Sequence, residues 1–329
     1  MDHLLVRKKS STSSSDQKPR DAKSAPYQNA RYENILATKG SFIGKSELDA
    51  TAKSKSLCRT LLETKQTFPD DSLFRDNLFE EAYEMVRNKN EARVVRDISS
   101  FMVPSAEILA IRGAKHLKIL IESVNEGWNN SIPITKTRPK PDYSVLKRIE
   151  PFVGELTDTS FFMATYSMYF PFLTYEAKCS AIAFDIAVGG IVELFRLVKR
   201  EKELYREILA FLISYDQRTV RIYGHYPIIK GNETTFYRHL IRTFDFTELD
   251  GKEKWTAYQF TKNIYDLWML THLKRICSVI EELPSHINFE VSERSELTES
   301  GLSQSLESHH ISRQSSHDGA SMLEEADSS

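Results

Sequence analysis

The residues best suited to chemistry are two carboxylates and a lysine in the middle of the chain. Asp142 follows Pro141 at the start of a predicted strand, and Glu176 and Lys178 lie near the end of the next predicted strand, residues 172–179. Because side chains alternate between the two faces of a strand, Glu176 and Lys178 are expected on the same side. If the two strands pair, the Asp142 carboxylate approaches that of Glu176. A carboxylate and an ammonium on a central strand are costly to bury unless they serve each other or a metal ion.

Together these groups have the chemistry of a phosphodiester-hydrolysing site. Two neighbouring carboxylates bind a hard cation such as Mg²⁺ through oxygen. The bound cation polarises a phosphate and lowers the pKa of a bound water. A nearby lysine orients or deprotonates that water, or stabilises charge that develops on the phosphate. The sequence therefore predicts Asp142 and Glu176 as Mg²⁺ ligands, Lys178 as a catalytic residue, and DNA or RNA as the partner.

The predicted secondary structure places these residues in an α/β domain. A helix start at Pro69-Asp70-Asp71 precedes apolar residues at helical spacing. Helices are predicted over residues 73–86, 90–101, 106–126, 186–206 and 254–283, and strands over 141–145, 172–179, 208–214, 219–226 and 235–247. The acids thus belong to two consecutive strands with helices before and after them, followed by more strands.

Several segments resemble an uncharacterised domain family of filamentous fungi. They are Val124–Pro133, Arg138–Tyr143, Phe170–Cys179, Val192–Leu197 and Arg221–Pro227, and the similarity covers roughly residues 75–284. The resemblance implies a fold of the PD-(D/E)xK nuclease superfamily, which is a restriction-endonuclease-like core with a central mixed sheet flanked by helices. The activity of the fungal family is itself undefined, so the resemblance implies a fold rather than a reaction.

Members of this superfamily usually add an acid from the helix before the first catalytic strand. Glu107, Glu122 and Glu126 are the candidates in the predicted helix over residues 106–126. Glu107 is preferred as a third catalytic acid because it lies at the edge of the apolar stripe, whereas the other two point more to solvent. The alternative role for Glu107 is to complement the helix dipole from the first turn.

The chain departs from its relatives at the adjacent glycines Gly189-Gly190. Relatives have a longer and more polar connection between the ExK strand and the following helix. A glycine inside a helix costs roughly 1 kcal/mol relative to alanine. We therefore expect this helix to begin late or to break near residue 189, which would weaken metal binding.

Composition bounds the remaining possibilities. Residues 1–69 are expected to be disordered or poorly ordered, residues 70–284 to form the nuclease-like domain, and the Ser-rich tail over residues 285–329 to be disordered. That tail carries a net charge of −7, which leaves +5 on the rest of the chain. Three widely spaced cysteines argue against a disulfide framework or a zinc site. With no apolar run of membrane-spanning length and no secretory signal, an intracellular location is expected, nuclear or cytoplasmic.

Two other interpretations remain open from the sequence alone. The domain could keep the nuclease fold as a catalytically inactive interaction module whose disordered ends are regulated. Glu176 and Lys178 could also be a structural ion pair in an unrelated α+β fold, in which case the two strands would not pair. The sequence contains no Ser/His/Asp arrangement, phosphate-binding glycine loop or dinucleotide-binding fingerprint.

Overall fold

The computed structural model describes residues 30–87, 91–132, 138–147, 162–165, 168–176, 182–216 and 218–283. Their helices are α1 (Ala30–Ala37), α2 (Ala52–Glu63), α3 (Asp76–Val86), α4 (Glu91–Met102), α5 (Ala106–Ile111), α6 (Ile182–Leu197), α7 (Glu248–Gly251), α8 (Thr256–Asn263) and α9 (Met269–Glu281). Short 3₁₀ helices η3 (Lys115–Ile119) and η4 (Glu201–Leu204) and the π-helical segment η5 (Ile264–Trp268) join them. The strands are β1 (Leu120–Val124), β2 (Tyr143–Lys147), β3 (Met163–Thr165), β4 (Met168–Glu176), β5 (Ala210–Tyr215), β6 (Thr219–Lys230) and β7 (Glu233–Asp245).

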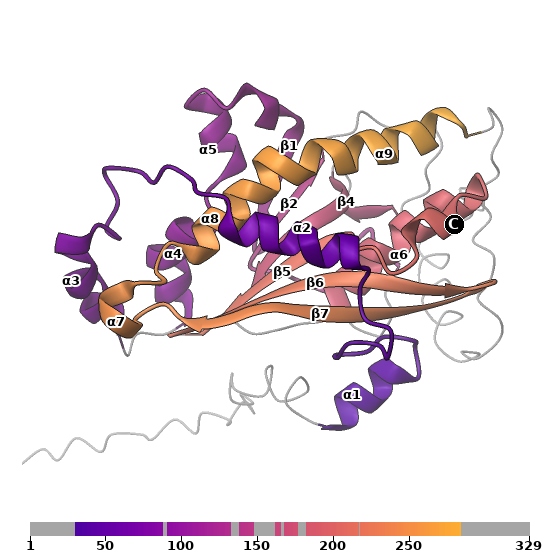
Figure 1. Ribbon diagram of the computed structural model, residues 1–329, viewed down its shortest axis with the longest axis horizontal. Helices are drawn as coiled ribbons and strands as arrows, with labels where there is room; N and C mark the ends of the chain where they lie inside the picture. The colour runs from indigo at the N-terminus through magenta and orange to yellow at the C-terminus, as the bar shows by residue number, and fades with distance from the viewer. Residues whose placement is uncertain are drawn as a thin grey trace, which may run out of the picture. The chain divides into compact units, whose positions relative to one another are not determined.

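Within the described residues, seven strands form one mixed sheet in the order β1-β2-β4-β5-β6-β7, with β3 paired to β4 (Figure 1). β4 and β5 are parallel, and the other pairs are antiparallel. Parallel neighbours need a crossover connection, which here contains α6. The prediction of a mixed α/β fold with helices around a central mixed sheet is therefore confirmed.

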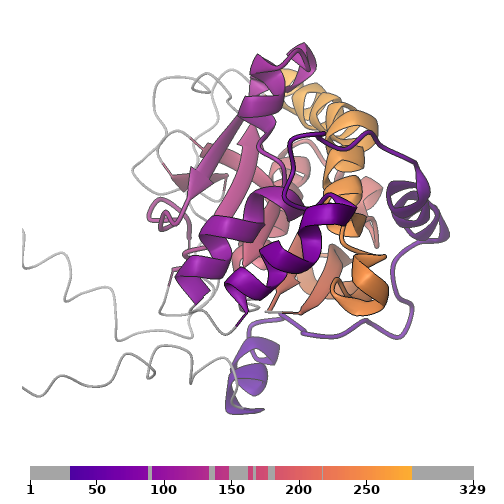
Figure 2. The same ribbon diagram turned by 90° about the vertical axis from the view of Figure 1, so that its left-hand side faces the viewer.

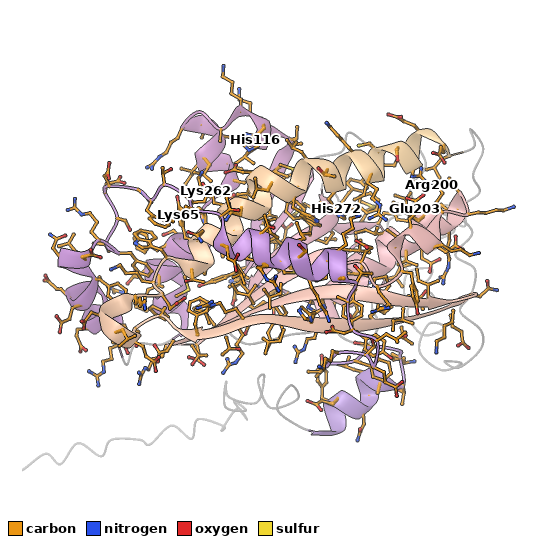
Figure 3. All side chains as sticks on the ribbon, in the orientation of Figure 1. Lys65, His116, Arg200, Glu203, Lys262 and His272 are labelled. Atoms are coloured by element: carbon orange, nitrogen blue, oxygen red, sulfur yellow. The ribbon has the colours of Figure 1, made fainter. Side chains whose placement is uncertain are left out.

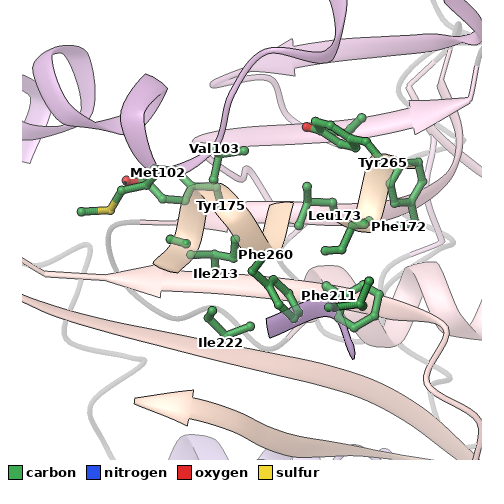
Figure 4. Packing of buried hydrophobic residues seen from close by; sticks show 14 of the residues in the cluster. Met102, Val103, Phe172, Leu173, Tyr175, Phe211, Ile213, Ile222, Phe260 and Tyr265 are labelled. Atoms are coloured by element: carbon green, nitrogen blue, oxygen red, sulfur yellow. Dashed lines mark hydrogen bonds between the residues drawn. The ribbon is translucent and has the colours of Figure 1, made fainter. Parts of the chain in front are cut away.

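The two faces of the sheet are packed differently. One face, which we call the aromatic face, is covered by residues of α4, α8 and α9, and its core contains Tyr175, Phe211, Ile213 and Phe260 (Figure 4). The other, the α6 face, packs side chains such as Leu212 against α6. Alternate residues of one strand enter different cores, as strand geometry requires. Figure 2 shows the helix of residues 256–281 as a layer beside the sheet.

An N-terminal segment, residues 40–51, pairs through residues 40–44 with part of the outer edge of β7. The amide of Phe236 donates to the Gly40 carbonyl, the amide of Phe42 donates to the Phe236 carbonyl, and the amide of Arg238 donates to the Gly44 carbonyl, at 2.7–3.1 Å. α2 then packs against α8. Residues 30–69, part of the region expected to be poorly ordered, therefore contain two helices and an edge-covering segment.

The predicted helix over residues 106–126 is wrong beyond its first turns. α5 ends at Ile111, Gly113 turns the chain with φ of 121°, and residues 120–124 form β1. A positive φ of this kind favours glycine. Leu120 enters the core of the aromatic face, whereas Ile121 packs on the α6 face. Because both faces of β1 bury apolar residues, its pattern does not alternate and resembles that of a helix.

The expected break at Gly189-Gly190 does not occur, because α6 runs without interruption from Ile182 to Leu197. A β-carbon added at Gly189 would lie 3.5 Å from the Phe236 ring, so this turn of α6 packs closely against β7. Burial of the apolar helix stabilises a segment that is weak in intrinsic propensity. Because the helix is not broken at the glycines, the structure gives no support to the weakened metal binding that was expected from such a break.

The ends of the domain differ less from expectation. α3 begins at Asp76, after the helix start predicted at residues 70–71. The predicted helix over residues 254–283 is present as α8, η5 and α9. Residues 1–29 and the acidic tail lie outside the described residues, so their predicted disorder stays a prediction. In the described part of the chain, no helix combines the length and the apolar character needed to cross a membrane.

Candidate functional site

The register of two strands brings the predicted acids together. β2 and β4 pair antiparallel, with Tyr143 opposite Tyr175. Asp142 directly precedes Tyr143 and Glu176 directly follows Tyr175, so the same register sets the two acids opposite each other. Directly opposite residues point to one face, with Cβ atoms about 4.5–5.5 Å apart. The strand pairing on which the predicted site depends is therefore present, and an unrelated fold without it is excluded.

Both acids are positioned by the sheet itself. The amide of Asn125 donates to the backbone carbonyl of Asp142 at 2.8 Å, which extends the pairing of β1 and β2 by one residue. Asp142 is half-buried, and Glu176 is only 4% exposed. Backbone ladders hold a side chain more firmly than a loop does. The two carboxylates therefore have fixed points of attachment on neighbouring strands.

The row that contains the acids continues over two more strands. Glu176 is opposite Ser214 in β5, and Ser214 is opposite Arg221 in β6. Asp142, Glu176, Ser214 and Arg221 thus form one line across the sheet, which we call the acid row. Its members alternate with Tyr175 and other residues of the aromatic face, so the acid row belongs to the α6 face. The acid row thus combines two carboxylates and one guanidinium at the same end of the neighbouring strands β2, β4, β5 and β6.

A second row of small polar residues lies next to the acid row on the same face. This hydroxyl row consists of Ser123, Ser144 and Thr174, paired across β1, β2 and β4 and at most 5% exposed. Within the described residues, the hydroxyls of Ser144 and Thr174 have no hydrogen-bond partner. Such groups are normally paired when buried. Each lies two residues from an acid, so strand alternation could have identified both from the sequence.

Glu107, the third acid preferred from the sequence, exchanges hydrogen bonds with Glu122 at the start of α5. The Glu122 carboxylate accepts hydrogen bonds from the Ser105 hydroxyl at 2.7 Å and from the Glu107 amide at 3.1 Å. The Glu107 carboxylate in turn accepts from the Glu122 amide at 3.2 Å. The Glu122 carboxylate thus satisfies a first-turn amide of α5, and the Glu107 carboxylate ties α5 to the backbone of β1. The placement of Glu107 beside the acids relied on a long helix that is not present.

Glu126 is the candidate that lies on the same face as the acids. Its carboxylate accepts a hydrogen bond of 2.8 Å from Ser123, a member of the hydroxyl row. Glu126 is exposed, as the sequence predicts, but it follows strand β1 and does not belong to a helix. Lys178 lies outside the described residues, so its position beside Glu176 stays a prediction.

The donor set suits a hard cation. Two carboxylates and nearby hydroxyls offer only oxygen, and Mg²⁺ in proteins is commonly held by one or two carboxylates together with waters and substrate phosphates. Among the described residues, no three Asp, Glu, His or Cys side chains cluster closely enough to hold a metal ion. Asp142 and Glu176 would therefore be the protein's carboxylate ligands in a site completed by other oxygens.

One comparison assigns the chain to a family. Residues 78–280 match the family described as Domain of unknown function (DUF7924). The chain belongs to this family. The matched range begins in α3, ends in α9 and includes every residue of the acid and hydroxyl rows. No curated protein matches the chain.

A second buried carboxylate of the DUF7924 domain, Asp185 in α6, has a different environment. The Ser41 hydroxyl donates to Asp185, and the His225 ring lies 4.0 Å from it. Burial raises the pKa of Asp185 to about 7, although Ser41 and the positive charge of Arg238 oppose this shift. Burial also lowers the pKa of His225 well below its usual value. This cluster lies within the core and joins the N-terminal segment to α6.

Two further features of the DUF7924 domain have structural explanations. Asp266, in the π-helical segment η5, pairs with His116 at 3.0 Å and Lys262 at 3.2 Å. Figure 3 labels His116 and Lys262. All three are partly exposed, so the network ties η3 to the C-terminal helix with little net electrostatic stabilisation. A shallow hollow on the α6 face is lined by apolar residues that include Trp128, Phe170 and Ile186. Its lining among the described residues offers no charged group for an ion.

Proposed function

We propose that this domain is a metal-dependent nuclease that hydrolyses phosphodiester bonds in DNA or RNA. The observation that carries the proposal is the register of β2 and β4, which sets Asp142 opposite Glu176 on one face. Two carboxylates on adjacent strands repel each other unless a cation or proton lies between them. A magnesium ion is the cation that fits an all-oxygen site of this kind.

The order of the elements supports the same proposal. The helix α5, the strands β2 and β4, the helix α6 and the strand β5 occur in the order expected for the PD-(D/E)xK superfamily, with β1 added before β2 and the short β3 added before β4. We therefore propose a restriction-endonuclease-like core and a relationship to the fungal family that the sequence resembles. A nucleic-acid substrate implies a nuclear or cytoplasmic place of action.

The residues have separate roles in the proposed reaction. Asp142 and Glu176 hold Mg²⁺, which when bound would polarise the phosphate and activate a water. Lys178 orients that water or stabilises negative charge on the phosphate. The hydroxyls of Ser144 and Thr174 provide further polar contacts beside the acids, and Glu126 is the carboxylate bonded to the same hydroxyl row through Ser123.

The decisive experiment is a nuclease assay on the full-length protein with increasing Mg²⁺ or Mn²⁺, using labelled DNA and RNA. Cleavage should require metal and should be lost in Lys178→Ala and Glu176→Gln. Glu107→Gln is the matched control and should retain cleavage, because the Glu107 carboxylate accepts a hydrogen bond from the Glu122 amide in β1. A folded protein that binds no metal and cleaves neither substrate would instead support a catalytically inactive interaction module.

A further inference from the structure

Arg221 shares the acid row with Glu176 but lies two strands away, in β6. Neighbouring strands are about 4.8 Å apart, so the Cα atoms of these residues are separated by roughly 10 Å. The residue between them is Ser214, whose side chain is short. A long arginine side chain on the same face can therefore extend towards a group bound at Glu176.

The guanidinium of Arg221 is weakly engaged within the protein. Its ion-pair partner among the described residues is Asp216, at 3.5 Å, and the two side chains are 39% and 52% exposed. An exposed pair of this length contributes little to stability. Two arginines nearby are held more closely, since Arg218 lies 2.9 Å from Asp245 and Arg242 lies 2.8 Å from Glu253.

We propose that Arg221 is an anion-binding residue of this site and contacts a phosphate group of the nucleic acid. This inference takes the nature of the substrate from the proposed function, whereas the anion-binding role follows from the acid row. A guanidinium presents a fork of donors that matches two phosphate oxygens. Acids that hold a cation at one end of the row and an arginine at the other would grip a phosphodiester from two sides.

Arg242 provides a matched control. It is opposite Ile222 in the β6–β7 pairing, one position along from Arg221, and therefore points to the aromatic face. Its side chain is 42% exposed, close to the value for Arg221. The two arginines thus differ in the face they occupy and in the distance to their partner, while both keep similar access to solvent.

The test measures binding of fluorescein-labelled single-stranded DNA and RNA to the full-length protein in EDTA, which prevents metal-dependent cleavage. Arg221→Ala should weaken binding about 10- to 100-fold and lower the slope of log affinity against log salt by about one. Arg221→Lys should retain the salt slope with weaker affinity, because it keeps the charge but not the fork. Arg242→Ala should stay within about twofold of the wild type.

Parallel cleavage assays separate this inference from the nuclease proposal. Loss of binding in Arg221→Ala but not in Arg242→Ala supports the inference even if the wild type cleaves nothing. Wild-type cleavage together with unchanged binding by Arg221→Ala overturns the inference and leaves the nuclease proposal standing. A wild-type protein that neither binds nor cleaves either oligonucleotide overturns both. Calorimetric Mg²⁺ affinity should be equal in wild type and Arg221→Ala, because the arginine is no metal ligand.

Discussion

Glu176 and Asp185 are both only 4% exposed, yet their surroundings differ. Asp185 lies within the core of the α6 face, where Ser41 donates to it and His225 lies 4.0 Å away. Glu176 lies at the end of a strand, in a row that leads to half-buried Asp142 and to partly exposed Arg221. Burial alone therefore does not distinguish the acid that we propose as a metal ligand from a buried acid within the core. The useful distinction is whether the polar neighbours of the acid are themselves accessible to solvent, as for Glu176, or buried with it, as for Asp185.

The largest difference between the two acids should appear in the pH dependence of stability. The pKa of Asp185 is raised to about 7 by burial, whereas an unfolded aspartate titrates near 4. The folded state thus binds the extra proton between these values, and wild-type stability from this group falls as the pH rises from about 4 to 7. Asp185→Asn cannot ionise. Its free energy of unfolding should therefore rise relative to that of the wild type by about 4 kcal/mol between pH 4 and pH values above 7.

Urea denaturation of wild type and Asp185→Asn at several pH values measures this difference. The effect of His272, whose pKa is lowered by burial, occurs in both proteins and cancels in the comparison. His225 lies 4.0 Å from Asp185, so its contribution is coupled to the substitution and is part of the measured difference. A difference that stays constant from pH 4 to pH 8 would show that Asp185 keeps its ordinary pKa in the folded protein.

Metal affinity should depend on Glu176 and be insensitive to Asp185. Changing groups beside metal ligands already weakens binding about 10- to 100-fold, so removing a ligand charge with Glu176→Gln should weaken Mg²⁺ or Mn²⁺ binding by about 100-fold or more. Asp185→Asn should bind the metal like the wild type, because Asp185 contacts Ser41 and His225. Isothermal titration calorimetry measures both affinities. An equal loss of metal affinity in Glu176→Gln and Asp185→Asn would contradict this prediction and would indicate a site nearer to α6.

The hydroxyl of Ser41 should contribute to stability through its buried bond to Asp185. Ser41→Ala is expected to lower the free energy of unfolding by about 2 kcal/mol, the range for a hydrogen bond to a charged group. Thr38→Ala is the control, since its hydroxyl donates to the Ile35 carbonyl in an exposed position. Chemical denaturation near pH 7.5 compares the two variants. If both lower the free energy of unfolding by a similar small amount, the bond between Ser41 and Asp185 does not stabilise the protein.

The smallest expected change concerns α6, the helix that carries Asp185. Gly189→Ala should stabilise the protein by up to about 1 kcal/mol, because alanine favours a helix and the new β-carbon makes ordinary contact with Phe236. Gly251→Ala is the opposite control, since Gly251 has φ of 76° and a β-carbon there would lie 2.3 Å from the Phe79 ring. Thermal melts of both variants test the close fit of α6 to the sheet.

The acids were predictable because they depend on local rules. Strand alternation and turn residues located β2 and β4, and one period of alternation from Asp142 and Glu176 leads to Ser144 and Thr174. Ser123 was not accessible in this way, because β1 resembles a helix in sequence when both of its faces are buried. Its identity as a strand depends on pairing with β2, which brings together residues far apart in the chain.

The reasoning behind two further expectations was limited by tertiary contacts in the same way. Glu107 was chosen from the geometry of an isolated helix, but the bond between Glu122 and Ser105 exists only because β1 folds back beside α5. The glycine pair in α6 was judged by intrinsic propensity, which the contact with Phe236 overrides. Propensity and spacing therefore located the two acids, while the residues around them were determined by packing.

The segment over residues 40–51 also bears on where the folding unit begins. The DUF7924 match starts at residue 78, yet the backbone of β7 is covered by Gly40, Phe42 and Gly44. A fragment trimmed to residues 78–280 would lack these groups and would expose the unpaired strand edge to other molecules. Exposed edges of this kind promote association between chains. A segment outside the matched family range can thus protect an edge strand of the domain from pairing with other chains.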